Sequence, residues 1–269
     1  MERKKLHEKV LYPVVRVIAK KAMGSGTILY SKPSETVPNE YETYVLTNCH
    51  VVEDSISYKK EWDALLKRDV KKEILDAVQV QEFRYYTGRS VVVGESSVQA
   101  DIVAYDKTQD LALLKARDVK KYEFVAEMFP RDGKLEMLME LLCVGCGMGE
   151  RPLMTYGFLS GMNREIDNYP YHLSSANSVF GNSGGAVFEK ESMQFVGVPS
   201  RIAVSLFGQA ITHMGYFIPV DRVYKFLDEQ IFEFIYDPTQ TPSACAKRRE
   251  EKREKDRIFA ANVSEESEK

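Results

Sequence analysis

The sequence has few of the residues and patterns that define several other protein classes. Only four of its 269 residues are cysteine, which is too few for a disulfide scaffold in a chain of this length. No apolar run approaches the roughly 20 residues of a membrane-spanning helix. Neither sign of charge dominates, since the formal net charge is −3. We therefore expect a globular chain with neither nucleic acid nor a membrane as its partner.

The start of the chain lacks the pattern of a secretory signal. Residues 1–9 are rich in charge, and no apolar segment follows the basic side chains. On this ground we predict a cytoplasmic location, provided that no leader was removed from the chain.

Two of the four cysteines, Cys143 and Cys146, have the C-x-x-C spacing of redox pairs and zinc sites. A zinc site would need a second pair of ligands, and none is evident. Cys143 directly follows an apolar run over residues 137–142. We favour reduced structural thiols, since a free cysteine behaves as a small buried hydrophobe. We expect no metal and no cofactor.

The most informative stretch that is present is Gly181-Asn182-Ser183-Gly184-Gly185. Glycines leave room for a substrate carbonyl beside a serine hydroxyl and allow backbone conformations closed to other residues. The N–H groups of Gly181 and Ser183 can then converge on one point, where an oxyanion would form. An ordinary Gly/Ser turn is the alternative for this stretch taken alone.

A serine hydroxyl needs a base, and His50 has the most suitable setting of the four histidines. It follows an apolar run of β type over residues 44–46 and a short polar turn. Asp110 is the best candidate for the carboxylate that orients the imidazole, because it directly precedes an apolar strand over residues 111–114. A structural histidine and a turn-capping aspartate are the alternatives for each residue alone. The order His50, Asp110, Ser183 is that of two-barrel proteases.

Beyond these three residues, the chain resembles the trypsin-like serine peptidases of the HtrA/Deg type. Six segments occur in the order typical of that family: residues 24–28, 46–52, 110–115, 157–161, 181–187 and 215–220. The resemblance implies an all-β fold of two packed antiparallel six-stranded barrels with the active site in the cleft between them. It also implies a catalytic triad of His50, Asp110 and Ser183, with an oxyanion hole at Gly181 and Ser183.

The resemblance predicts one protease domain over residues 1–235. Its N-terminal barrel covers about residues 10–120, its C-terminal barrel about 135–220, and a closing helix about 221–235. Three departures from the family stand out. The stretch between His50 and Asp110 is long, the family's Gly-x-Pro-x-Gly turn reads differently at residues 145–149, and the chain after Val220 is too short for a PDZ-like domain with a linker.

Two segments fall outside the β pattern. In residues 58–78, apolar residues recur at helical spacing, and we predict an amphipathic helix inserted between His50 and Asp110. We expect it to pack on the first barrel; a regulatory surface is the alternative. Residues 236–269 form a charged, flexible tail, in which residues 247–257 hold seven basic and four acidic side chains. This part is a solvated helix or a disordered segment rather than a docking site.

By the resemblance, the pocket for the residue before the scissile bond is lined by Asn177, Ser200, Arg201, Ile202 and Gly215. No carboxylate stands at its base, where we place Asn177, so a buried lysine or arginine of the substrate would lack a counter-charge. We expect small or medium uncharged residues there.

These observations predict a serine endopeptidase that acts on proteins or peptides, including unfolded chains. Two other function classes stay open. One is an inactive binding module that keeps the fold, and the other is a chaperone-like protein in which proteolysis is secondary. An oligomer is compatible with the sequence.

Overall fold

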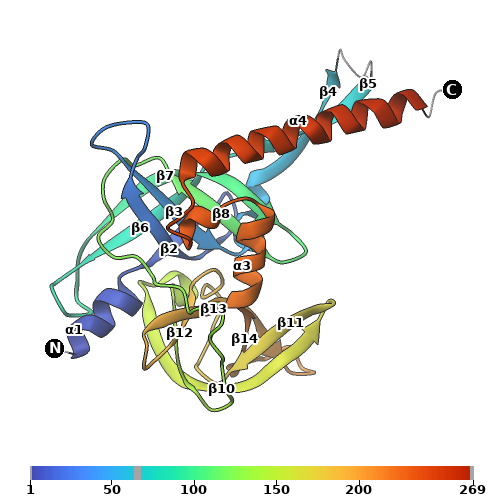
Figure 1. Ribbon diagram of the computed structural model, residues 1–269. Coiled ribbons are helices and arrows are strands. Elements are labelled where there is room, and N and C mark those ends of the chain that lie inside the picture. Colours follow the sequence, from blue (N-terminus) through green and yellow to red (C-terminus); the bar gives the residue numbers. More distant parts are fainter. Residues whose placement is uncertain (1, 64–67, 267–269) are drawn as a thin grey trace.

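Most strands of the chain form two closed barrels, as the computed structural model shows for residues 2–63 and 68–266 (Figure 1). In each barrel every neighbouring pair of strands is antiparallel. The first barrel contains, in spatial order, β1 (Val14–Ile18), β2 (Met23–Pro33), β3 (Tyr41–Thr47), β8 (Leu111–Ala116), β7 (Val92–Asp106) and β6 (Val78–Tyr85). The second contains β10 (Leu153–Ile166), β11 (Tyr169–Ser174), β14 (Ala210–Pro219), β13 (Gln194–Val204), β12 (Ala186–Glu189) and β9 (Glu140–Gly145). The predicted two-barrel fold is confirmed.

The apolar runs of β3 and β8 are continuous because both faces of these strands are buried. Side chains of a strand alternate between its two faces. Val45 and Leu114 point into the core of the first barrel. Leu46 and Leu113 point instead into the largest apolar cluster, which also contains residues of the second barrel and of helix α3 (Val220–Glu229). The strands that carry the candidate site therefore lie between two cores.

Helix α3 holds the two barrels together at one side of their junction (Figure 1). Its Arg222 is buried and donates hydrogen bonds to the carbonyl of Gln109 in the first barrel and to that of Pro170 in the second. The remaining α-helices are α1 (Glu2–Leu6), α2 (Cys49–Val52) and α4 (Pro242–Glu266).

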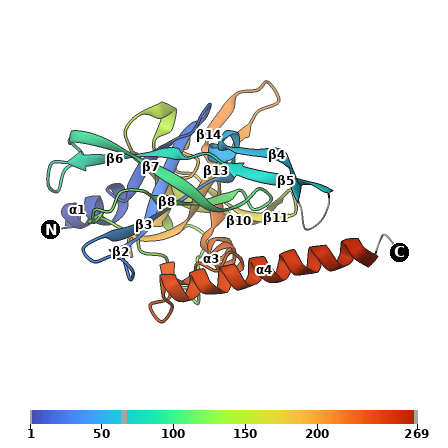
Figure 2. The same ribbon diagram turned by 90° about the horizontal axis from the view of Figure 1, so that it is seen from above.

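The predicted inserted helix is wrong. The segment forms a two-stranded hairpin of β4 (Ile56–Asp63) and β5 (Arg68–Leu75), which projects from the first barrel (Figure 2). Trp62, Val70 and Ile74 belong to the stripe used for the prediction, whereas its Leu65 and Leu66 lie outside the described residues. A step of four places residues on one face of a helix and also on one face of a strand. The spacing of the apolar residues therefore could not distinguish the two.

The closing helix is shorter than predicted. It ends at Glu229, and a 3₁₀ turn over Glu233–Ile235 follows. Ile231, just after the helix, has a φ of 58°. This left-handed conformation favours glycine, but the residue here is isoleucine.

The C-terminal segment corresponds to the first of its two predicted alternatives, a helix. The start of α4 packs against the rest of the chain, and Cys245 there is fully buried. The guanidinium carbon of Arg249 lies 4.0 Å from the centre of the Phe232 ring. Farther along, α4 extends past the barrels on the side where the β4–β5 hairpin projects (Figures 1 and 2).

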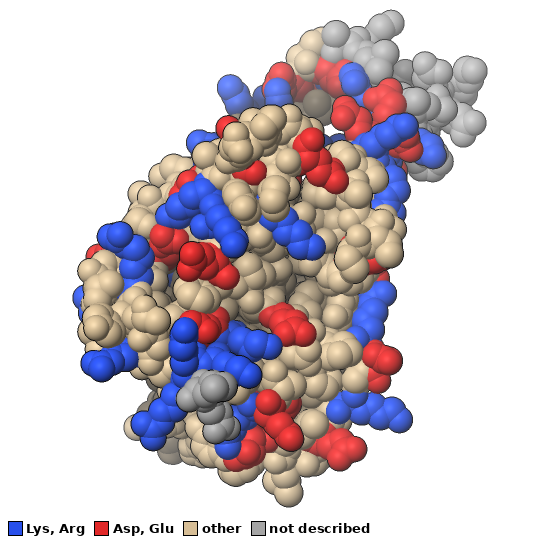
Figure 3. All heavy atoms as spheres, turned by 60° about the vertical axis from the view of Figure 1, so that its left-hand side comes forward, with Lys and Arg blue, Asp and Glu red and all other residues tan. Residues whose placement is uncertain are grey.

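Charges of both signs are interspersed over the face shown in Figure 3, in keeping with the small net charge. Among the described residues, no helix has the length and apolar character needed to cross a membrane.

Candidate active site

Strand pairing brings His50 and Asp110 together although 60 residues separate them. β3 ends at Thr47, and β8 begins at Leu111. The two strands are antiparallel neighbours with Thr47 opposite Ala112, so the residue positions just beyond Thr47 and just before Leu111 lie side by side. His50 in helix α2 and Asp110 occupy this common end.

The carboxylate of Asp110 is enclosed by hydrogen-bond donors. His50 Nδ1 lies 2.9 Å from both carboxylate oxygens, and the backbone N–H of His50 donates to Oδ1 at 3.0 Å. Ser200 Oγ donates to Oδ2 at 2.6 Å. Because a carboxylate only accepts hydrogen bonds, Nδ1 carries a proton, and in the neutral imidazole Nε2 then has the free lone pair. The imidazole is thus held in the tautomer that a general base requires.

The backbone of Asp110 is held in a left-handed conformation, with a φ of 55°. Aspartate tolerates this region better than most residues. The Asn48 side-chain amide donates to the Asp110 carbonyl at 2.8 Å, and Arg222 donates to the preceding carbonyl of Gln109 at 2.9 Å. Sequence reasoning missed Asn48 and Arg222, because their roles depend on contacts across the fold.

Ser183 lies in the glycine-rich loop before β12, beside the same carboxylate group. Its Oγ donates to the carbonyl of Ser200 at 3.4 Å, and Ser200 Oγ in turn binds Asp110. Gly184 has a φ of 83°, and a Cβ there would lie 2.2 Å from the carbonyl oxygen of Ser25, so this position requires glycine. Among the hydrogen bonds of the described residues, none joins Ser183 Oγ to His50. The structure therefore joins His50 directly to Asp110, while Ser183 and Asp110 each form a hydrogen bond with Ser200.

The two predicted oxyanion donors are the backbone N–H groups of Gly181 and Ser183. Within the described parts of the chain, the N–H groups of Gly181 and Ser183 take part in no hydrogen bond. Gly181 has a φ of 97°, which only glycine adopts readily.

The residues of the predicted substrate pocket differ in their surroundings. Asn177 is exposed, and its carbonyl accepts a hydrogen bond from Thr155 Oγ1 at 2.6 Å. The buried neighbour Ser178 takes its place beside Gly215, where both line a cavity of about 10 Å³. A Cβ on Gly215 would lie 3.0 Å from that of Ser178, so the walls nearly touch.

The other three residues of the predicted pocket lie along β13. The Ser200 hydroxyl donates a hydrogen bond to Asp110. Arg201 forms an ion pair of 2.7 Å with Asp167. Ile202 is half-buried and pairs with Gly215 in the β13–β14 ladder.

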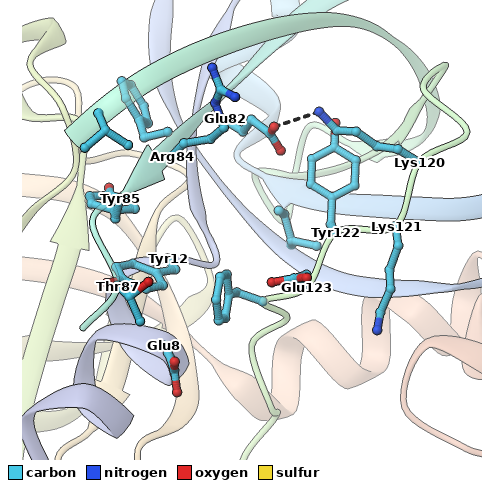
Figure 4. A pocket seen from close by; sticks show the side chains of 14 residues that line it. Glu8, Tyr12, Glu82, Arg84, Tyr85, Thr87, Lys120, Lys121, Tyr122 and Glu123 are labelled. Atoms are coloured by element: carbon cyan, nitrogen blue, oxygen red, sulfur yellow. Dashed lines mark hydrogen bonds and ion pairs between the residues drawn. The ribbon is translucent and has the colours of Figure 1, made fainter. Parts of the chain in front are cut away.

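A larger surface pocket of about 630 Å³ lies elsewhere, in the first barrel (Figure 4). Its walls come from β6, from the N-terminal segment around Tyr12 and from residues 120–124. Lys120 and Glu82 form an ion pair of 2.7 Å at its edge. None of its lining residues belongs to the predicted triad, so it is separate from the candidate site.

All four cysteines are free and buried. Burial raises the pKa of Cys143 and of Cys146 to about 11, so both thiols stay protonated at neutral pH. This agrees with the predicted structural role of the C-x-x-C pair.

The buried His172 should make the stability of the protein depend on pH. Burial lowers the pKa of this imidazole, which packs edge-on against Phe217. As the pH falls below the ordinary value of about 6.5, the unfolded chain takes up a proton before the folded chain does. The free energy of unfolding should therefore decrease from pH 7 to pH 5. We expect His172→Gln to reduce this slope in urea unfolding, and the same change at exposed His213 is the control substitution. Equal slopes for all three proteins would contradict the prediction.

Comparison with known proteins decides the family. The family described as "Trypsin-like peptidase domain" matches residues 24–198, which is more than half of the chain. The chain belongs to this family. Sequence similarity extends to a probable periplasmic serine endoprotease, DegP-like, of Rhizobium meliloti (strain 1021), with 33% identity over 110 residues. That match covers 40% of this chain and 21% of the relative, so the chain spans about a fifth of the relative's length.

Solved structures of the HtrA type share the fold. The HtrA-type protease AlgW with tripeptide superposes with a TM-score of 0.61 and 20% identity, covering 86% of this chain and 64% of that one. A second structure of AlgW with tripeptide, of a variant protein, has the same TM-score and coverage with 19% identity. The predicted HtrA/Deg-type resemblance of this trypsin-like peptidase is confirmed.

The predicted cytoplasmic location is contradicted by the sequence comparison. The relative matched in sequence is named as periplasmic. The prediction failed because the charge pattern of residues 1–9 describes only those residues and does not report the compartment of the protein.

Proposed function

We propose that this trypsin-like peptidase is a serine endopeptidase with Ser183 as its nucleophile. The observation that carries the proposal is the Asp110 carboxylate, which orients His50 Nδ1 and is joined through Ser200 to the Ser183 hydroxyl. His50 acts as general base and acid, Asp110 orients it, and the N–H groups of Gly181 and Ser183 form the oxyanion hole.

In the proposed reaction, Ser183 Oγ bonds to the carbonyl carbon of the scissile peptide while its proton passes to Nε2 of His50. The carbonyl oxygen becomes an anion and accepts hydrogen bonds from the two N–H groups. The C–N bond then breaks, and His50 returns the proton to the leaving amine. Water repeats the sequence on the acyl-enzyme and restores the Ser183 hydroxyl.

An open strand edge supports a polypeptide substrate. Strand β12 pairs with β13 only as far as Gly197, whereas β13 continues to Val204 along β14. Among the described residues, no strand pairs with β13 beyond Gly197 on the side of β12, and the Ser200 carbonyl of this part contacts Ser183 Oγ. An extended peptide can add to such an edge as a further strand. A segment that is already folded in the substrate does this less readily, because its backbone is not extended. Unfolded or locally unfolded proteins fit this geometry.

One observation favours a second candidate, a binding module without peptidase activity. Ser183 Oγ donates to the Ser200 carbonyl, and its bond to His50 is not formed among the described residues. A module of this kind would bind chains at the β13 edge but leave them intact.

Reaction with a fluorophosphonate probe distinguishes the two candidates. We expect the folded protein to gain one adduct, located at Ser183 by mass spectrometry of its peptides. Ser183→Ala should not react, and His50→Ala should react far more slowly, because the hydroxyl then lacks its base. No adduct on the folded protein, or an adduct at a different serine, would contradict the peptidase proposal.

A further inference from the structure

Ser25 is a fully buried polar residue whose hydroxyl and backbone N–H form hydrogen bonds next to the candidate site. It belongs to β2 of the first barrel. Its Oγ donates to the Gly181 carbonyl at 2.7 Å and accepts from the N–H of Cys146 at 2.7 Å. Its backbone N–H donates to the Ser183 carbonyl at 2.8 Å, and its carbonyl accepts from Thr47 Oγ1 at 2.7 Å. One residue of the first barrel thus contacts the nucleophile loop and the turn that follows β9.

That turn controls the direction of the Gly181 N–H. The N–H of Met148 donates to the Phe180 carbonyl at 2.6 Å. In a trans peptide the C=O and the next N–H point in opposite directions. Because the Phe180 carbonyl faces the turn at residues 146–149, the N–H of Gly181 faces away from it. If the turn moved, this peptide plane would lose the bond that sets its orientation.

The hydroxyl of Ser25 holds the turn and the loop in contact. It bridges Cys146, the first residue of the turn, and Gly181, the residue whose N–H must be oriented. The fit is close, since a Cβ on Gly181 would lie 2.5 Å from the Cys146 carbonyl oxygen and one on Gly145 would lie 3.0 Å from Ser25 Oγ. Without the hydroxyl, the buried N–H of Cys146 and the half-buried carbonyl of Gly181 would both lose this partner, which is costly.

We propose that Ser25 is a positioning residue for the oxyanion hole. Its hydroxyl keeps the turn at residues 146–149 against Gly181, and the Gly181 N–H thereby stays directed at the point where the oxyanion forms. The proposal rests on the proposed peptidase function. Because Ser25 belongs to the first barrel and both N–H groups belong to the second, the oxyanion hole depends on the contact between the two barrels.

The kinetics of Ser25→Ala test this role. A misdirected N–H weakens the transition state and leaves substrate binding nearly unchanged. We expect kcat for a peptide substrate to fall about 10- to 100-fold. This loss is no larger than the loss in kcat when an oxyanion donor is removed. KM should change by no more than about threefold. Ser31→Ala is the matched control, since Ser31 lies on the same strand and its Oγ accepts the Tyr122 N–H at 3.0 Å, away from the site. Its kcat should stay within about twofold.

Binding of a peptide boronic acid gives a second readout. Ser183 Oγ adds to the boron, the proton passes to His50, and an oxygen of the tetrahedral adduct enters the oxyanion hole. Ser25→Ala should weaken this binding by about tenfold or more, while the affinity for a peptide of the same sequence without the boronic acid stays within about threefold. Ser25→Thr, which keeps the hydroxyl, should restore most of the affinity.

Two results would overturn the role of Ser25: a kcat of Ser25→Ala within about threefold of the unmodified protein, or an equal loss in Ser31→Ala. If Ser25→Ala does not fold, Ser25→Cys is measured with the same thresholds, because it keeps the size of the side chain but forms weaker hydrogen bonds. Failure of the unmodified protein to bind the boronic acid would contradict the peptidase function itself.

Discussion

Replacing Ser183 by alanine should lower kcat for an unfolded protein substrate by about five to six orders of magnitude. In the proposed mechanism the loss is this large because Ser183 supplies the oxygen that forms the acyl-enzyme. The backbone N–H groups of the oxyanion hole remain, so a residual rate above the uncatalysed reaction should persist. Release of fluorescent peptides from a labelled, denatured protein measures the change.

A loss of folding has to be distinguished from this effect. Among the described residues, Ser183 Oγ has one hydrogen bond, a long one of 3.4 Å to the Ser200 carbonyl, so the thermal midpoint of Ser183→Ala should differ little from that of the unmodified protein. Ser192→Ala, in the turn between β12 and β13, is the matched serine control and should keep full activity. Substantial cleavage by purified Ser183→Ala would show that another residue is the nucleophile.

The second large effect is expected for Asp110→Asn, with a fall in kcat of about four orders of magnitude. An asparagine has nearly the same shape, but its amide group can donate a hydrogen bond to His50 Nδ1. The imidazole proton would then move to Nε2, which faces Ser183 in the proposed reaction and must be free to accept a proton. The hydrogen bonds that His50 N–H and Ser200 Oγ donate to the carboxylate would also weaken.

Asp106→Asn serves as the control for this change, because Asp106 is a neighbouring carboxylate with a structural role. It accepts hydrogen bonds from Thr108 and Gln109 within the turn before β8, and these bonds lower its pKa despite the opposing effect of burial. Its substitution should reduce stability and leave kcat within about threefold. Comparable kcat values for Asp110→Asn and Asp106→Asn would mean that Asp110 only caps the turn.

Residue types and their order along the chain were sufficient to propose the candidate triad, whereas the two-barrel fold was predicted from the resemblance to a known family. The glycines around Ser183 indicate close backbone approach, and Gly184 indeed has no room for a side chain. The apolar runs beside His50 and Asp110 predict buried strands, and β3 and β8 are buried on both faces. Such signals are local, so they can be recognised without knowing which strands become neighbours.

Other features depended on which segments pair in space. Residues 58–78 have a four-residue apolar spacing that fits a helix and a strand equally, and only the ladder between β4 and β5 decides for the strand. Asn48 and Ser200 bind Asp110 across 62 and 90 residues of sequence. No local pattern marks such contacts, because they arise from barrel closure and from the packing of one barrel on the other. The sequence thus determined the chemical groups of the candidate site, while the tertiary structure decided how each one is held.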